Sequence, residues 1–275
     1  MARRALLPLL SVLLVSCRGG GAPAHATFRD GQWVWSAADS ALLAASVRGG
    51  ASLTAGVWVS TVRPAVPGDS LAQTLALPPS AAGLAPIAAV VRFDDAFHAW
   101  WADHSDRVTA DQLDRRLRTL LDLLSRSGAT VTEVQLDYDC PVRLLPRWAR
   151  VLHRLRHSSL EGREVWITSL LAHQRDPAFG RRLRGAVDGQ ILQLFDTGDR
   201  AAGARLDDLE RRLVRQGLPF RVGLGAFERR LPGGGLTDHV AWFGAVRELR
   251  TWPGFRGLWV FPAGRPYQRL VREAS

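Results

Sequence analysis

The sequence predicts an α/β fold: a single closed (β/α)8 barrel of the TIM type, with parallel strands that alternate with helices. The chain has 275 residues, 47% of them hydrophobic, which suits one barrel of roughly 250 residues once an N-terminal segment is set aside. Eight short apolar segments, most of them rich in β-branched or aromatic residues, recur along the chain. Helical patterns or long loops separate these segments, and such alternation indicates parallel strands joined by right-handed crossovers.

The first residues are predicted to be a targeting signal that is not part of the barrel. Arg3 and Arg4 precede an apolar run at residues 5–15, which is too short to span a bilayer as a mature helix. The run ends in Leu-Val-Ser-Cys at Cys17, which resembles the lipobox of bacterial lipoproteins. That resemblance implies that Cys17 carries a lipid. Cleavage after Ala26, at a small-residue site, is the alternative and would release a protein without an anchor.

This interpretation divides the chain into three parts. We expect a signal segment at residues 1–17, a flexible linker rich in Gly, Ala and Pro at 18–30, and the barrel domain at 31–275. A lipid on Cys17 would make the protein an exported, membrane-anchored lipoprotein, periplasmic or associated with the outer membrane. The membrane is therefore one expected partner.

The expected strands follow the apolar segments, and the expected helices follow the spacing of the leucines. Thr109 and Gln112 form a predicted capping box, after which leucines recur along one helical face as far as Leu124. Residues 60–83, rich in Pro, Ala and Ser, have no strong helical face, so a long loop is expected there. Strands are expected at 32–35, 53–59, 87–93, 132–137, 164–169, 189–194, 220–224 and 257–261. Further helices are expected at 145–156, 177–186, 206–216 and 237–249.

Composition argues against several classes of function. The net charge is +10, but all 36 basic residues are arginines and no lysine occurs, which indicates a compositional bias and not selection for phosphate contacts. The arginines are spread along helices and no nucleic-acid motif accompanies them, so we expect no nucleic-acid partner. Two cysteines exclude a disulfide scaffold and a cysteine-based zinc site. No nucleotide motif or metal-ligand spacing is present, so we expect no cofactor and no metal.

The segment at residues 132–139 is the most informative for function. Period-two alternation places Gln135, Asp137 and Asp139 on one face of a strand. In a parallel barrel covered by helices, that face points inward and toward the carboxyl-terminal mouth. Two neighbouring carboxylates are costly to bury without partners, which favours a functional site. The alternative is a structural aspartate that caps a helix or pairs with an inward arginine.

The order of motifs along the chain resembles a bacterial family. Gln-Leu-Asp-Tyr-Asp-Cys-Pro at 135–141 is followed by the helix at 145–156 and by Trp-Ile-Thr-Ser-Leu at 166–170. Matching segments also occur at 33–35, 91–94, 187–189, 192–193 and 218–222. Over most of the mature chain this order resembles a domain-of-unknown-function family of predicted glycosidase-like TIM barrels. The resemblance implies the fold and a link to glycans, and it names no substrate.

A looser similarity is to chitinase-type barrels, whose fourth strand carries alternating acids and ends in a catalytic glutamate. In this sequence the final position is Asp139, a shorter acid. We take Asp139 as the candidate acid and Asp137 as its orienting or nucleophilic partner. Because glycoside hydrolysis generally needs a second carboxyl group, Asp196 and Glu228 are further candidates for that role.

Other polar and aromatic residues are expected to bind substrate at the mouth. Arg92 ends an apolar strand, where its guanidinium should meet a carboxylate or an anionic ligand. Gln193 ends another strand and could hydrogen-bond a sugar hydroxyl. Trp35, Trp100 and Trp101 lie at or after predicted strand ends, and flat aromatic rings stack on the apolar faces of sugars.

Two functions of different class remain open from the sequence. One is an envelope glycosidase-like enzyme that acts on a glycan by carboxylate acid/base chemistry. The other is a non-catalytic glycan-binding or envelope-scaffold lipoprotein that keeps the barrel and lacks a complete acid pair. A second carboxylate near Asp139 in an open cleft would favour the enzyme.

Overall fold

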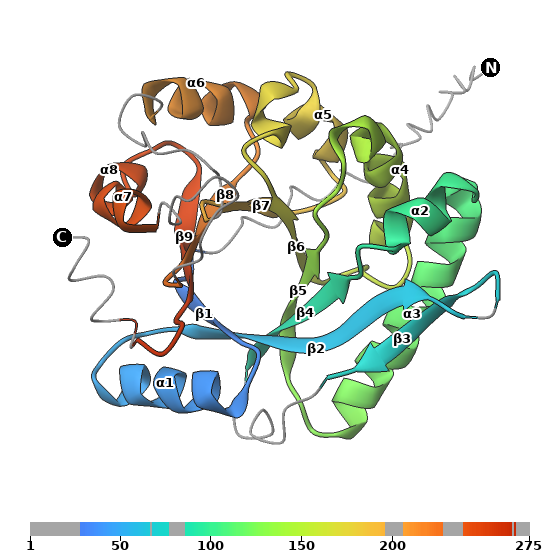
Figure 1. The fold of residues 1–275 in the computed structure, drawn as a ribbon, viewed down its shortest axis with the longest axis horizontal. Coiled ribbons are helices and arrows are strands. Elements are labelled where there is room, and N and C mark those ends of the chain that lie inside the picture. The colour runs from blue at the N-terminus through green and yellow to red at the C-terminus, as the bar shows by residue number, and fades with distance from the viewer. Residues whose placement is uncertain are drawn as a thin grey trace, which may run out of the picture.

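The structure is a computed structural model that describes residues 28–66, 68–76, 86–195, 206–227, 239–265 and 267. Eight parallel strands close into a barrel, because β1 pairs with β2 on one side and with β9 on the other. Helices surround it in an outer ring (Figure 1). The barrel strands are β1 (Gly31–Val34), β2 (Thr54–Pro64), β4 (Ile87–Phe93), β5 (Val131–Asp137), β6 (Glu164–Ser169), β7 (Gly189–Gln193), β8 (Phe220–Gly225) and β9 (Phe255–Phe261).

The helices of the outer ring connect successive strands. In α4 and α6, apolar residues at helical spacing are buried against the barrel, as the leucine patterns predict. Among the described helices, none has the length and apolar character needed to cross a membrane. The helices are α1 (Ala37–Arg48), α2 (Phe97–Ala102), α3 (Asp106–Arg126), α4 (Leu145–Arg156), α5 (Phe179–Leu183), α6 (Leu206–Gln216), α7 (His239–Gly244) and α8 (Val246–Leu249), with short 3-10 turns η2 (Val142–Leu144) and η3 (His173–Arg175).

The long loop expected at residues 60–83 is a wrong prediction in part. β2 continues to Pro64, and β3 (Leu71–Leu75) pairs with its extension in antiparallel register. Val62 and Leu71 are fully buried, and the main-chain nitrogen of Leu71 donates to Gln112 Oε1 of α3 at 2.6 Å. Packing against α3 therefore makes a hairpin of a segment whose Pro and Ser content suggested a loop.

Three helix boundaries also differ from the expectation. Ser105, not Thr109, caps α3: its hydroxyl accepts from the main-chain nitrogen of Val108, and Thr109 lies inside the helix. The helix expected at 177–186 is confined to α5. The helix expected at 237–249 is divided into α7 and α8, and its first two residues lie outside the described chain.

The residues directly before β1 contact the barrel through their side chains. The Asp30 carboxylate accepts from the main-chain nitrogen of Leu258 at 2.7 Å and from Tyr267 at 2.9 Å, and it pairs with Arg250 at 2.8 Å. Arg29 lies 3.2 Å from the Glu164 carboxylate. These contacts tie the start of the domain to the strand-start end of the barrel.

Tryptophans fill the middle of the barrel. Trp33, Trp166 and Trp259 point inward from three strands and are almost fully buried. Glycines on other strands leave room for them: a Cβ at Gly56 would lie 2.4 Å from Trp259, and one at Gly189 would lie 2.3 Å from Trp166. This packed layer separates the strand-start end of the interior from the carboxyl-terminal mouth.

Candidate functional site

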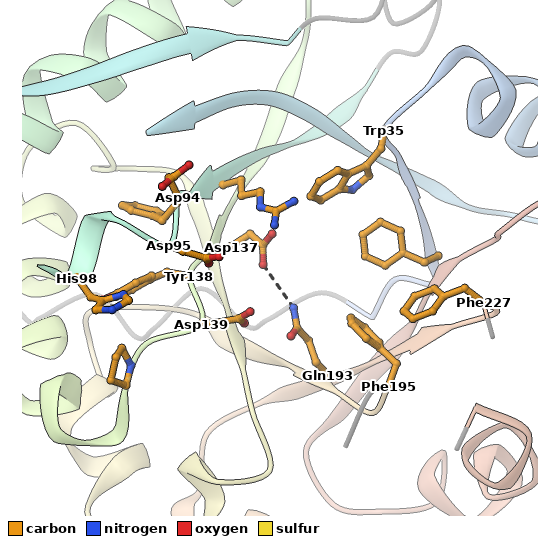
Figure 2. Close-up of a pocket in the computed structure, with 14 residues that line it drawn as sticks. Trp35, Asp94, Asp95, His98, Asp137, Tyr138, Asp139, Gln193, Phe195 and Phe227 are labelled. Atoms are coloured by element: carbon orange, nitrogen blue, oxygen red, sulfur yellow. Dashed lines mark hydrogen bonds between the residues drawn. The ribbon is translucent and has the colours of Figure 1, made fainter. Parts of the chain in front are cut away.

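A cavity of about 320 Å³ lies at the carboxyl ends of the strands, above the tryptophan layer. This is the face on which barrel enzymes place their sites. Figure 2 shows the carboxylates of Asp95, Asp137 and Asp139 gathered in the cavity, with Trp35 and Phe195 across from them. The polar residues that line it are Arg92, Asp94, Asp95, His98, Asp137, Asp139 and Gln193, and the aromatic ones are Trp35, Phe93, Tyr138, Phe195, Phe227 and Phe261.

β5 brings Asp137 and Asp139 into this cavity. The inward positions of the strand are Glu133, Gln135 and Asp137, and Asp139 follows on the same side just past the strand end. Asp137 is half-buried, whereas Asp139 lies at the rim and keeps more of its surface in water. Gln193, at the end of β7, donates to Asp137 Oδ1 at 3.4 Å. The inward direction of the acidic stripe is therefore as the alternation predicts.

The environment of the two aspartates favours their protonated forms. Burial, together with the negative charge of Asp139, raises the pKa of Asp137 to about 6. Desolvation also raises the pKa of Asp139, with a smaller contribution from the charge of Asp95, whereas Arg92 lowers it. A carboxyl group whose pKa is raised toward neutrality can donate a proton near physiological pH.

Asp94 and Asp95 add two carboxylates that the sequence reasoning did not weigh as partners of Asp139. Asp94 Oδ1 accepts from the main-chain nitrogen of Ala96 at 2.8 Å, so it stabilises the turn after β4. Asp95 is exposed and near enough to Asp139 to raise the pKa of that carboxyl. Its position directly after a barrel strand was the signal that could have identified it.

Arg92 lines the cavity without a tight ion pair. Its guanidinium carbon lies 5.1 Å from the ring centroid of Trp35, and it pairs in register with Asp137 across β4 and β5. Within the described part of the chain no carboxylate lies within 4 Å of its nitrogens. Its charge nevertheless lowers the pKa of both Asp137 and Asp139. Arg92 therefore remains available to a ligand in the cavity.

The three predicted stacking tryptophans separate into two groups. Trp35 lines the cavity, where it stacks on Trp58 at 5.0 Å. Trp101 is fully buried and Trp100 is 9% exposed, and neither lines the cavity. Both lie on α2 and face the core, where Trp100 stacks on His104 at 3.9 Å. The expectation that Trp100 and Trp101 face the mouth does not hold, because α2 turns them inward. Phe195 and Phe227 line the cavity instead.

Several other residues can be placed or set aside. Cys17, Asp196 and Glu228 lie outside the described residues. Cys140 is buried, and burial raises the pKa of its thiol to about 12, which disfavours a thiolate nucleophile. In the described ranges, no three His, Cys, Asp or Glu side chains are grouped as metal ligands.

Comparisons with known proteins match the fold and not the sequence. No family model matches the chain, and no curated protein does. A chitinase from Chromobacterium violaceum ATCC 12472 superposes with a TM-score of 0.62, over 90% of this chain and 99% of that chain, at 12% identity. The spore cortex-lytic enzyme SleL of Bacillus cereus superposes with a TM-score of 0.54, over 90% and 75% of the chains, at 12% identity.

A protein named as an inhibitor shares the same architecture. A xylanase and α-amylase inhibitor protein, solved in complex with trehalose, superposes with a TM-score of 0.51, over 90% of this chain and 97% of that one, at 12% identity. Such low identities establish the fold alone. The chain therefore shares the barrel fold of these proteins, and its function has to be argued from its own cavity.

Proposed function

We propose that the mouth cavity binds a glycan and hydrolyses a glycosidic bond by carboxylate acid/base chemistry. The observation that carries this proposal is the pair Asp137 and Asp139, which lie side by side in an open cavity and have raised pKa values. The nearby charge of Arg92 lowers both pKa values, yet burial keeps them raised. The glycan-acting neighbours of the same fold support the proposal.

The proposed reaction assigns both proton transfers to Asp139 and a supporting role to Asp137. Asp139 donates its proton to the glycosidic oxygen as the bond between that oxygen and the anomeric carbon breaks. A water oxygen then bonds to the anomeric carbon, and the proton that the water loses passes to the ionised Asp139. Asp137 orients Asp139 through the charge coupling between them, or takes the nucleophilic role; Asp95 is a further carboxylate at the same cavity.

The remaining lining residues would position the sugar. Trp35, Phe195 and Phe227 offer aromatic faces for stacking on pyranose rings. Arg92 and Gln193 present hydrogen-bond donors next to Asp137, where they would meet ring hydroxyls. A polar centre with aromatic walls is the lining expected of a carbohydrate site.

The test is a hydrolysis and binding screen of the full chain against β-linked and α-linked glycans. Asp139→Asn should reduce hydrolysis by about 100-fold or more, the usual contribution of a general acid, and should leave glycan binding in place. Asp122→Asn, which alters an exposed acid of α3, is the matched control and should hydrolyse at the wild-type rate. Equal rates for wild type and Asp139→Asn would refute the assignment.

A non-catalytic glycan-binding protein is the second candidate. It is favoured by one observation: aspartate occupies the strand-end position where chitinase-type barrels carry a longer glutamate. One protein with the same fold is named for inhibition and not for hydrolysis. Glycan binding without turnover, weakened by Trp35→Ala and kept in Asp139→Asn, would identify this second function.

The location and family remain proposals that rest on the sequence. We propose that the protein is exported and anchored through a lipid on Cys17, and that it belongs to the family of glycosidase-like barrels which its motif order resembles. Radiolabelled palmitate should label the full chain in a bacterial host and should not label Cys17→Ala. Equal labelling of both proteins would refute the anchor.

A further inference from the structure

A second cavity lies on the outside of the barrel, between α5 and α6. Its volume is about 330 Å³, and it shares no lining residue with the mouth cavity. The two helices lie side by side in the outer ring (Figure 1). Gly180 permits their close approach, because a Cβ there would lie 2.4 Å from the main-chain oxygen of Gln216. Backbone packing therefore holds the two walls of this α5–α6 cleft together.

The lining of the α5–α6 cleft is strongly basic. Arg212 is held in place by Asp208, whose Oδ2 lies 2.7 Å from its Nε. Arg175 and Arg215 are exposed and form no ion pair within 4 Å with any described residue. The described lining residues include no carboxylate; they are Gln174, Arg175, Pro177, Arg181, Arg212, Arg215 and Gln216.

Nearby acids neutralise these arginines only in part, through the pair of Arg212 with Asp208. Asp176 pairs with Arg182, and its Oδ1 accepts from the main-chain nitrogen of Ala178 at 2.9 Å. Asp208 is shared between Arg212 and the exposed Arg211. Several guanidinium groups around one cleft create a positive potential that favours an anion, and their planar geometry suits carboxylate and phosphate oxygens.

The floor of the cleft consists of buried amides. Gln174 and Gln216 are each 3% exposed. Gln174 Nε2 donates to Gln190 Oε1 at 2.9 Å, and Gln216 Nε2 donates to the main-chain oxygen of Gln174 at 3.3 Å. Gln174 Oε1, in contrast, is buried without a hydrogen-bond partner among the described residues. Such an acceptor is satisfied when a hydroxyl donor reaches it.

We propose that the α5–α6 cleft is a binding site for an anionic saccharide. The arginines take the carboxylate or phosphate group of the sugar, and the amide floor takes a hydroxyl through Gln174 Oε1. The site is separate from the mouth, so it goes beyond the proposed hydrolysis. It would hold an acidic polysaccharide strand against the side of the barrel.

Calorimetric titration of the full chain tests the ligand class. The probes are an oligogalacturonate, a phosphorylated mannooligosaccharide, a neutral maltooligosaccharide of the same length and a single-stranded oligodeoxynucleotide of the same charge. We expect one or both of the acidic saccharides to bind, more weakly as salt rises, and the neutral one not to bind. Failure of both acidic saccharides, or tighter binding of the oligonucleotide, would overturn the proposal.

A matched pair of double variants tests the place of binding. Arg175→Gln/Arg215→Gln removes two cleft charges, whereas Arg48→Gln/Arg126→Gln removes two exposed charges from the ends of α1 and α3. The cleft variant should bind the acidic saccharide about tenfold more weakly or worse, as expected for lost charge-assisted hydrogen bonds. The control should stay within about twofold of wild type. Equal losses in both variants would show delocalised charge and overturn the site.

Discussion

The two ends of the barrel interior differ in whether their charged side chains form ion pairs. At the strand-start end, Arg221 and Glu133 are fully buried and lie 2.6 Å apart, and Arg221 also reaches Glu164 at 3.3 Å. At the mouth, the same strand β5 ends in Asp137, and Asp139 follows just past its end. Neither of these forms an ion pair within 4 Å with a described residue. At the closed end the acidic side chains are neutralised by arginines of the protein. At the open end the carboxylates are available to water or a ligand.

The difference separates structural charge from functional charge. A buried ion pair is tolerated only when both partners and their hydrogen bonds are present. An unpaired carboxyl group in a cavity makes the fold less stable at the pH at which it ionises, and such groups are concentrated at functional sites. Along β5 the inward side chains change from the paired Glu133, through Gln135, to the unpaired Asp137.

The largest expected effect comes from breaking the buried pair. Arg221→Met would remove the shorter ion pair of the buried Glu133 and leave only Arg29, whose nitrogen lies 3.5 Å from its carboxylate. The methionine keeps contact with the Trp166 ring, whose centroid lies 3.7 Å from the guanidinium. We expect the free energy of unfolding to fall by about 3–5 kcal/mol, measured by urea unfolding.

A second substitution sharpens this test. Adding Glu133→Gln removes the buried acidic charge and should restore part of the lost stability. Arg115→Met, on the exposed surface of α3, should change the free energy of unfolding by less than about 0.5 kcal/mol. A cost below about 1 kcal/mol for Arg221→Met would mean that the closed end does not depend on its ion pair.

The opposite effect is expected at the mouth, where Asp137→Asn should stabilise the protein at neutral pH. The pKa of Asp137 is raised to about 6 in the folded protein, against about 4 in an unfolded chain. The folded state thus binds the proton more tightly, so this stabilising contribution is complete below about pH 4 and is lost as the pH rises to 6. The variant should be about 1–2 kcal/mol more stable at pH 7, allowing for partial exposure.

Urea unfolding of Asp137→Asn at several pH values distinguishes this explanation from a general effect. The gain in stability should shrink toward pH 4, where wild-type Asp137 is largely protonated in both states. A gain of the same size at pH 4 and pH 7 would contradict the pKa argument.

A smaller effect is expected when Arg92 is neutralised. Arg92 lowers the pKa of Asp137 and of Asp139, so Arg92→Gln should raise both. Carboxyl-carbon NMR titration should show both pKa values raised in the variant. Arg107→Gln, at the exposed start of α3, should leave the titration of Asp137 unchanged. Unchanged titration in both variants would remove Arg92 from the electrostatics of the mouth.

The smallest effects concern the tryptophans. With the glycan that the full chain binds in the screen, Trp35→Ala should weaken binding about fivefold, the usual value of one aromatic contact. Trp100→Phe should leave affinity unchanged, because Trp100 packs on His104 away from the cavity. Titration calorimetry measures both. Stronger loss from Trp100→Phe than from Trp35→Ala would reverse our placement of the stacking surface.

Local patterns predicted most of the secondary structure of the barrel. Strand and helix periodicities are local properties, so β4 and α4 have the expected bounds. The hairpin of β2 and β3 was missed because its stability comes from α3, which lies elsewhere in the sequence. The prediction that Trp100 faces the mouth was wrong for the same reason. Its distance in sequence from a strand end does not determine whether α2 directs its side chain to the core or to the cavity.

The sequence by itself determined the barrel, the inward direction of Asp137 and Asp139, and the polar character of the mouth, because alternation along one strand and strand order suffice for these. Only the tertiary structure decided which charges are paired. Arg221 meets Glu133 from 88 positions away, and Asp95 comes close to Asp139 only because their strands are neighbours in the barrel. Charge pairing depends on distances between segments remote in the chain, and no local pattern contains those distances.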